Sequence, residues 1–238
     1  MTGSMTGGIS VVIPMRDGAR YVTAALDSIA AQDPAVARVI VVDDGSVDDG
    51  PQIAASHPLR PELVSIPPSG IGAARNCGIA RVDTEFVAFL DADDLWTPDH
   101  CRLLLAALTG DSTLAMAFGH AEQFLSPDVP EETAARLHVP ERPMPALVTG
   151  AMLARRAVFD RVGLFDPGIR VAEFVHWLLA AEHRGERYRV LPDVVLRRRH
   201  HGANVGRLRE DDRRLDFVRV IREHLHRRRA SMAGDPEP

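Results

Sequence analysis

Three carboxylates gather within the four residues Asp91-Ala92-Asp93-Asp94, directly after the apolar run 85–90. Carboxylates this close repel one another unless a cation or hydrogen-bond donors lie between them. Hard oxygen ligands at this spacing suit Mg²⁺ or Mn²⁺, which typically bind one or two carboxylates together with substrate phosphates. The cluster therefore predicts a divalent-metal site, and the alternative is a solvated cap at the start of a helix.

Other polar residues also stand where apolar runs end. Pro14, Arg16 and Asp17 follow 9–13, Asp43 and Asp44 follow 38–42, and Gly70, Gly72, Arg75 and Asn76 follow 62–66. If these runs are parallel strands, the clusters meet at one sheet edge, where open α/β sheets bind ligands. Asp43–Ser46, taken alone, is equally typical of a turn and helix cap. Segment 70–76 lacks the third glycine of the dinucleotide fingerprint, yet it can bring helix N–H groups and Arg75 to a phosphate.

The elements that must position these residues alternate between strand and helix. We expect strands at 9–13, 38–42, 62–66 and 85–90, and helices after Gly18, after Gly50, and over 72–81 and 98–109. This order predicts a single α/β domain, with a mostly parallel twisted sheet and helices on both faces. The second half predicts a strand at 114–118 and helices at 153–162 and 172–183. It also predicts strands at 187–191 and 194–198, or one strand broken at Pro192, and a long loop over 125–146 with one helical turn near Ala134.

Composition narrows the class of protein. The 238 residues are 45% apolar and 26% charged, which suits one α/β domain with a full core. The net charge of −5 argues against nucleic-acid binding. All 28 basic residues are arginine, which excludes a P-loop lysine and a Schiff-base lysine. The two cysteines, and the lack of a run long enough to span a membrane, indicate a cytoplasmic protein, and residues 1–8 are expected to form a disordered leader.

Taken together, these motifs resemble the family 2 glycosyltransferases of the GT-A fold. The resemblance rests on ISVVIP, VVDDGSVDDG, GIGAARNCGIA and FLDADD, and continues through residues 150–166 and RRHHGAN at 198–204. It implies a glycosyltransferase domain over 9–205, with a nucleotide-binding half at 9–109 and an acceptor-side half at 110–205. Members of this family transfer a sugar from a nucleotide-diphosphate donor with inversion at the anomeric carbon.

The resemblance also implies how the nucleotide would be bound. Pro14 and Arg16 would line the nucleoside pocket, and Asp44 would accept a hydrogen bond from a uracil or thymine base. Arg75 would approach the base or the diphosphate, and Asp91 would face the ribose or Arg75. The implied donor is therefore a UDP- or dTDP-sugar.

The Asp-x-Asp motif of the family corresponds to Asp91-Ala92-Asp93. Asp93 would hold Mg²⁺ or Mn²⁺ on the diphosphate, and His201 would reach that metal or the diphosphate from the C-terminal side. These roles fit the chemistry, because a departing diphosphate carries charge that a divalent ion and arginine can neutralise.

The chain departs from the family where the general base is expected. Glu173 matches the glutamate of the usual Glu-Asp pair, but Phe174 stands in place of the aspartate and cannot accept a proton. Glu173 or His176 could serve as the base, or the acceptor could be a thiol, which ionises readily. Glu173 is equally suited to capping the helix start. A further alternative is a catalytically impaired subunit that binds nucleotide sugars.

The acceptor and the C-terminal region are less defined. The acceptor could be a glycan, a lipid-linked molecule, a peptide or a small natural product, and His120, Gln123 and Trp177 are candidates to line its site. Residues 206–238 are assigned to a C-terminal amphipathic helix, over 209–229, and a tail. The arginines of that helix suit packing on the domain, on a second subunit in a homodimer, or on an anionic membrane surface. A sugar-nucleotide pyrophosphorylase is disfavoured, because the loop after the first strand lacks the lysine that such enzymes use.

Overall fold

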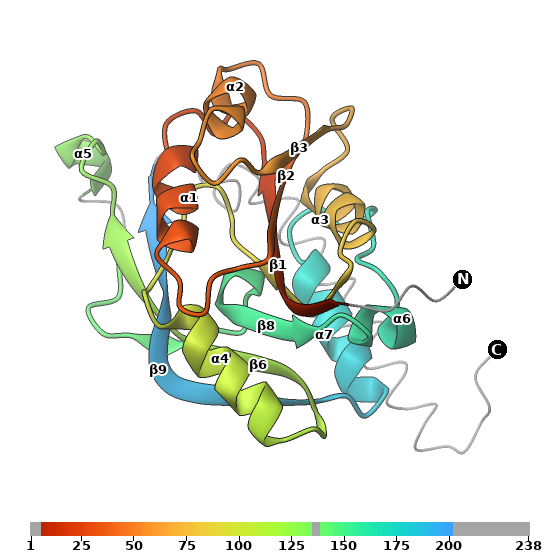
Figure 1. The fold of residues 1–238 in the computed structure, drawn as a ribbon. Coiled ribbons are helices and arrows are strands. Elements are labelled where there is room, and N and C mark those ends of the chain that lie inside the picture. The colour runs from red at the N-terminus through yellow and green to blue at the C-terminus, as the bar shows by residue number, and fades with distance from the viewer. Residues whose placement is uncertain (1–5, 135–138, 202–238) are drawn as a thin grey trace.

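The computed structural model describes residues 6–134 and 139–201, which form an α/β domain around one sheet (Figure 1). Its strands are β1 (Thr6–Met15), β2 (Arg38–Asp43), β3 (Glu62–Ser65), β4 (Thr84–Phe89), β5 (Leu95–Trp96), β6 (Leu114–Leu125), β7 (Met144–Pro145), β8 (Met152–Arg155) and β9 (Arg187–His200). Its helices are α1 (Val22–Ala30), α2 (Gly50–Ala55), α3 (Ile71–Ile79), α4 (His100–Gly110), α5 (Glu131–Ala134), α6 (Val158–Val162) and α7 (Glu173–His183), with a 3₁₀ turn at Thr149–Ala151.

The sheet has the strand order β3-β2-β1-β4-β8-β6-β9-β5, with β7 paired to β6. β1 runs parallel to both β2 and β4, and β2 runs parallel to β3, while β8 is antiparallel to β4 and β6. This arrangement confirms the predicted α/β class with a mostly parallel sheet. The carboxyl ends of β1, β2 and β4 lie side by side, so the polar residues that follow these strands share one edge.

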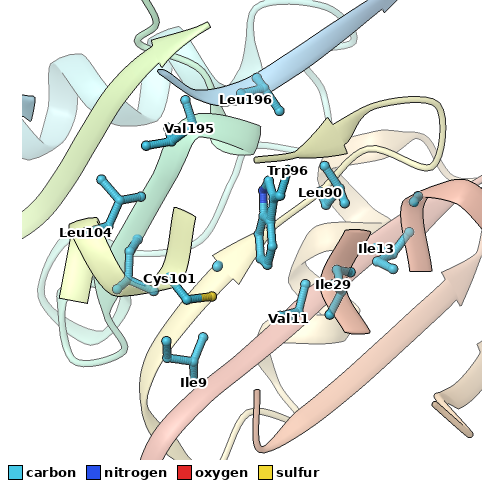
Figure 2. Close-up of a cluster of buried hydrophobic side chains, with 14 of the residues drawn as sticks. Ile9, Val11, Ile13, Ile29, Leu90, Trp96, Cys101, Leu104, Val195 and Leu196 are labelled. Carbon is cyan, nitrogen blue, oxygen red and sulfur yellow. The ribbon is translucent and has the colours of Figure 1, made fainter. Parts of the chain in front are cut away.

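Hydrophobic cores cover both faces of the sheet, as predicted. Because successive side chains of a strand point to opposite faces, Val11 and Ile13 of β1 pack with α1 and α4, whereas Val12 packs with α3 and α7. Figure 2 shows part of the first core, where Trp96 lies among residues of β1, α4 and β9. Both faces are therefore apolar, and the chemistry is confined to the edges and loops.

His100 is a buried titratable group at the start of α4. Its ring stacks on Trp96 with centroids 3.8 Å apart, and its Nδ1 lies 3.1 Å from the carbonyl oxygen of Val195. Burial lowers the pKa of His100 to about 3. The unfolded chain therefore binds a proton below about pH 6.5 that the folded chain does not bind, and stability is lost as the pH falls from 6.5 towards 3.

We expect His100 to make the fold acid-sensitive. Between pH 7 and pH 5, the wild type should lose about 2 kcal/mol more unfolding free energy than His100→Asn, whose amide can donate to the same carbonyl but does not titrate. Urea unfolding at the two pH values measures this difference. Equal losses in both proteins would contradict the assignment.

The helix expected over 153–162 is only partly correct. Met152–Arg155 form strand β8, and the helix α6 begins at Val158. Leu153 and Ala154 are buried between β4 and β6, with which they pair, so sheet pairing overrides the helical preference of this alanine- and arginine-containing segment. The short strand β5 was not predicted at all.

The expected disorder of residues 1–8 is wrong for residues 6–8. β1 begins at Thr6, which pairs with Thr84 of β4. A Cβ on Gly8 would lie 3.1 Å from Ala37, and Gly8 has a φ of +129°, a conformation that favours glycine. Glycine thus allows the chain to pass close to the residues before β2 and extend the strand.

β9 is one continuous strand that passes through Pro192. Its pairing with β6 shifts register between Phe118 and His120, which is the kind of irregularity where a strand tolerates proline. Among the described residues, no helix combines the length and apolar character needed to cross a membrane. The predicted helix over 209–229 lies outside the described residues.

Candidate active site

The loops that follow β1 and β2 are interlocked. The backbone N–H of Asp17 donates to the Ser46 hydroxyl at 2.9 Å, and the Asp17 carboxylate accepts from the Val47 N–H at 2.8 Å. Asp17 adopts a φ of +52°, which is uncommon outside glycine and places its side chain for this contact. The exposed Arg16 therefore stands on a loop that the second loop holds in place.

Asp44 fixes the start of α3. Its two carboxylate oxygens accept from the N–H groups of Ser69 and Gly70 at 2.6 and 2.9 Å, and the residue is buried. Pro14 lies buried in β1, opposite Val42 of β2. Asp44 therefore holds a loop 25 residues further along the chain, and its predicted contact with a nucleotide base stays a prediction.

Arg75 of α3 is the centre of a buried ion-pair network. Its Nη2 donates to Asp91 at 2.8 Å, at the end of β4, and its Nη1 donates to Glu173 at the start of α7. Arg75 is 3% exposed and Glu173 is 4% exposed. The structure thus joins three of the predicted site residues in one network, and it pairs the candidate base with an arginine.

Close packing of α3 explains why Arg75 reaches this position. A Cβ on Gly78 would lie 2.3 Å from Val12 Cγ1, so glycine is required for α3 to approach β1 this closely. On the same helix, Asn76 donates to the Phe165 carbonyl at 2.8 Å and accepts from the Phe165 N–H at 3.0 Å. Asn76 therefore anchors the segment that leads into α7 and brings Glu173 towards Arg75.

Burial dominates the electrostatics of two carboxyls. Burial raises the pKa of Glu173, and the Arg75 cation opposes that rise. The pKa of Asp94 is raised well above its ordinary value, first by burial and then by the negative charges of Asp93 and Asp91. The like-charge repulsion expected from the sequence is therefore present at the Asp91–Asp94 cluster.

Asp93 and His201 lie together, as a shared metal site requires. His201 Nε2 is 2.9 Å from Asp93 Oδ2, and His201 is largely buried whereas Asp93 is half-buried. Within residues 6–134 and 139–201, no set of three or more His, Cys, Asp or Glu side chains is arranged to hold a metal ion. A metal role for this pair, which would need further ligands from a bound diphosphate and water, stays a prediction.

The positions around the expected base have different environments. Phe174 is 6% exposed and packs in the core with Phe118, Phe165 and Trp177. Trp177 is also core, and its indole N–H donates to the Gly163 carbonyl at 2.7 Å, so it does not line an acceptor site. His176 is half-buried on α7. Phe174 therefore stabilises the fold, and Glu173 is the carboxylate of this helix that reaches Arg75.

Sequence reasoning missed two structural partners of the site. The Glu173–Arg75 pair joins residues 98 positions apart, and no local pattern signals it. Arg199 falls within the motif RRHHGAN at 198–204, and its backbone N–H donates to Asp94 at 2.8 Å while its Nε donates to the Asp93 carbonyl at 2.8 Å. Gln123 of β6 forms a hydrogen bond with His200 of β9, whose Nε2 lies 2.6 Å from Gln123 Oε1, so Gln123 also supports β9.

Comparison with solved structures finds the same fold. Staphylococcus aureus TarS, residues 1–349, superposes with a TM-score of 0.67 at 22% identity, covering 92% of this chain and 65% of that one. The same part of TarS in complex with UDP-GlcNAc gives a TM-score of 0.64 at 22% identity, covering 83% of this chain and 60% of that one. At this identity, the likeness establishes the fold alone.

Comparison of sequences establishes the family. EpsH of Bacillus subtilis is 32% identical over 122 residues, covering 50% of this chain and 35% of EpsH. The succinoglycan biosynthesis protein ExoO of Rhizobium meliloti is 28% identical over 210 residues, covering 78% of this chain and 59% of ExoO, so this chain spans only part of either relative. The model of the family described as "Glycosyl transferase family 2" matches residues 10–163. Because that match covers well over half of the chain, the protein belongs to glycosyl transferase family 2.

Proposed function

We propose that this protein transfers a sugar from a UDP- or dTDP-sugar to an acceptor, with inversion at the anomeric carbon and with Mg²⁺ or Mn²⁺. The observation that carries the proposal is the convergence of Asp44, the Arg75–Asp91–Glu173 network and the Asp93–His201 pair on the edge formed by β1, β2 and β4. TarS, which shares the fold, has been solved with UDP and with UDP-GlcNAc, and this favours a uridine donor.

In this proposal, the first loops hold the nucleoside. Pro14 and Arg16 line its pocket, and Asp44 accepts from the imide N–H of the base while it also holds Ser69 and Gly70. A carboxylate has about four lone-pair sites, so two backbone bonds leave acceptor capacity for the base. Asp91 orients Arg75 next to the diphosphate, where the guanidinium offers positive charge.

Asp93 and His201 are proposed to hold the metal. The pair supplies one carboxylate oxygen and one imidazole nitrogen from two different segments, and the diphosphate would supply further oxygen ligands. A bound divalent ion would neutralise the negative charge that develops on the departing diphosphate. Asp93 and His201 thus fix where that charge is accommodated.

Glu173 is our candidate for the general base that takes the acceptor's proton. Burial raises its pKa, which makes its carboxylate a stronger base, and it shares Arg75 with Asp91. A role for His176, or an acceptor thiol that needs little help, is the alternative outcome of the tests below.

Both cysteines, Cys77 and Cys101, are free, which supports a cytoplasmic location.

Thermal unfolding with nucleotide tests the metal and donor assignments. UDP or dTDP should stabilise the protein by about 2.7 kcal/mol at 100-fold excess over the dissociation constant, and only when Mn²⁺ or Mg²⁺ is present. Asp93→Ala should lose the metal dependence, whereas Asp193→Ala, an exposed aspartate of β9, should retain it. Equal stabilisation of the wild type and Asp93→Ala by UDP with Mn²⁺ would refute the metal site.

Release of UDP from UDP-sugars then tests for catalysis. Turnover by hydrolysis or transfer supports an enzyme. Metal-dependent nucleotide binding without any turnover, across several donors and acceptors, would instead support the impaired binding subunit.

A further inference from the structure

Arg199 joins the last strand to the acidic turn. Its backbone N–H donates to the buried Asp94 carboxylate, and its side-chain Nε donates to the backbone carbonyl of Asp93, both at 2.8 Å. Two residues further along, His201 meets the Asp93 side chain at 2.9 Å. Arg199 therefore links the acidic turn that carries Asp93 to the strand end that carries His201.

Two aromatic rings hold the Arg199 guanidinium in place. Its Cζ lies 4.9 Å from the centre of the Tyr21 ring and 4.7 Å from the centre of the Phe124 ring. We call Tyr21 and Phe124 the aromatic clamp. The Tyr21 ring also lies 4.8 Å from the His201 ring, and its hydroxyl donates to Asp128 at 3.2 Å. The clamp thus contacts both Arg199 and His201, from α1 and β6.

The Arg199 side chain is held by contacts from several parts of the chain, which distinguishes it from an arginine that projects into solvent. Tyr21 comes from the start of α1, Phe124 from β6 and Arg199 from β9, so three separate segments meet at one guanidinium. A planar guanidinium can stack between two rings while it donates in its own plane, and lysine cannot reproduce this geometry. By contrast, Arg198 on the same strand is exposed.

We propose that Arg199, held by the aromatic clamp, is a positioning residue that sets the Asp93–His201 pair for the divalent ion. This inference rests on the proposed metal-dependent function. Groups that orient metal ligands typically contribute 10–100-fold to metal affinity. Arg199 acts through Asp93 and His201, so its loss should weaken binding of the metal before it affects the fold.

Mn²⁺ binding, measured by electron paramagnetic resonance with saturating UDP, tests the proposal without any activity assay. Arg199→Met and Arg199→Lys should each raise the Mn²⁺ dissociation constant about 10–100-fold. Arg198→Met removes a charge near Asp94 without removing a contact to Asp93, and it should bind Mn²⁺ as the wild type does. If Arg199→Met folds and binds Mn²⁺ with wild-type affinity, the proposal is wrong.

Variants of the clamp keep the test decisive if Arg199→Met does not fold. Tyr21→Phe keeps the ring and should retain Mn²⁺ affinity, whereas Tyr21→Leu removes one stacking face and should lose it. Wild-type affinity in Tyr21→Leu would overturn the inference. A wild type that binds UDP without any effect of Mn²⁺ would refute the proposed metal site itself, so the two failures give different results.

Discussion

Replacing Glu173 by glutamine is expected to lower the turnover number about 10²–10⁴-fold, the usual contribution of a general base. Nucleotide affinity should change little, because the glutamine oxygen can still accept a hydrogen bond from Arg75. Arg75 also keeps its ion pair with Asp91. Since the acceptor is unidentified, the first measurement is UDP release from UDP-sugars with water as the acceptor. Glu182→Gln, on the exposed face of the same helix, provides the matched control.

A Glu173→Gln variant that retains its turnover would assign Glu173 to holding Arg75 and not to proton transfer. His176→Ala would then test the other candidate general base on α7. Comparison of thiol and hydroxyl acceptors between pH 6 and pH 9 would test self-activation, because a thiol with an ordinary pKa of about 8.5 titrates in that range and a hydroxyl does not.

Replacing Arg75 by methionine is expected to lower the free energy of unfolding by about 3–5 kcal/mol, because it leaves buried Glu173 without its cation. The loss should be greater at pH 8 than at pH 5. Without Arg75, the pKa of Glu173 rises further above its unfolded value, so stability is retained at low pH, where the carboxyl is protonated, and lost as the pH rises. Urea unfolding at both pH values measures the change.

The double variant Arg75→Met/Glu173→Gln provides the control for this interpretation. It removes the uncompensated buried charge, so it should recover part of the lost stability and most of the pH dependence. A single Arg75→Met variant that loses under about 1 kcal/mol would mean that water reaches Glu173 and screens its charge.

The strand ends and their polar residues were predictable from the sequence, because buried parallel strands have continuous apolar runs and their ends share an edge. Asp44 and the Asp91–Asp94 cluster were found in this way. The Arg75–Glu173 pair was not, since it depends on how α7 packs against α3. The strand β8 was also missed, because its short segment becomes a strand only through pairing with β4 and β6.

The place of β9 in the sheet has a consequence for how the protein folds while it is being synthesised. β9 is the last strand of the described chain, yet it lies between β6 and β5 and ends beside His201. A nascent or truncated chain that stops before residue 187 would present the backbone of β6 unpaired on one side, which is a template for aggregation. It would also lack the histidine opposite Asp93. Incomplete products would thus be prone to aggregation, and the contact between Asp93 and His201 could form only after residue 201 has been synthesised.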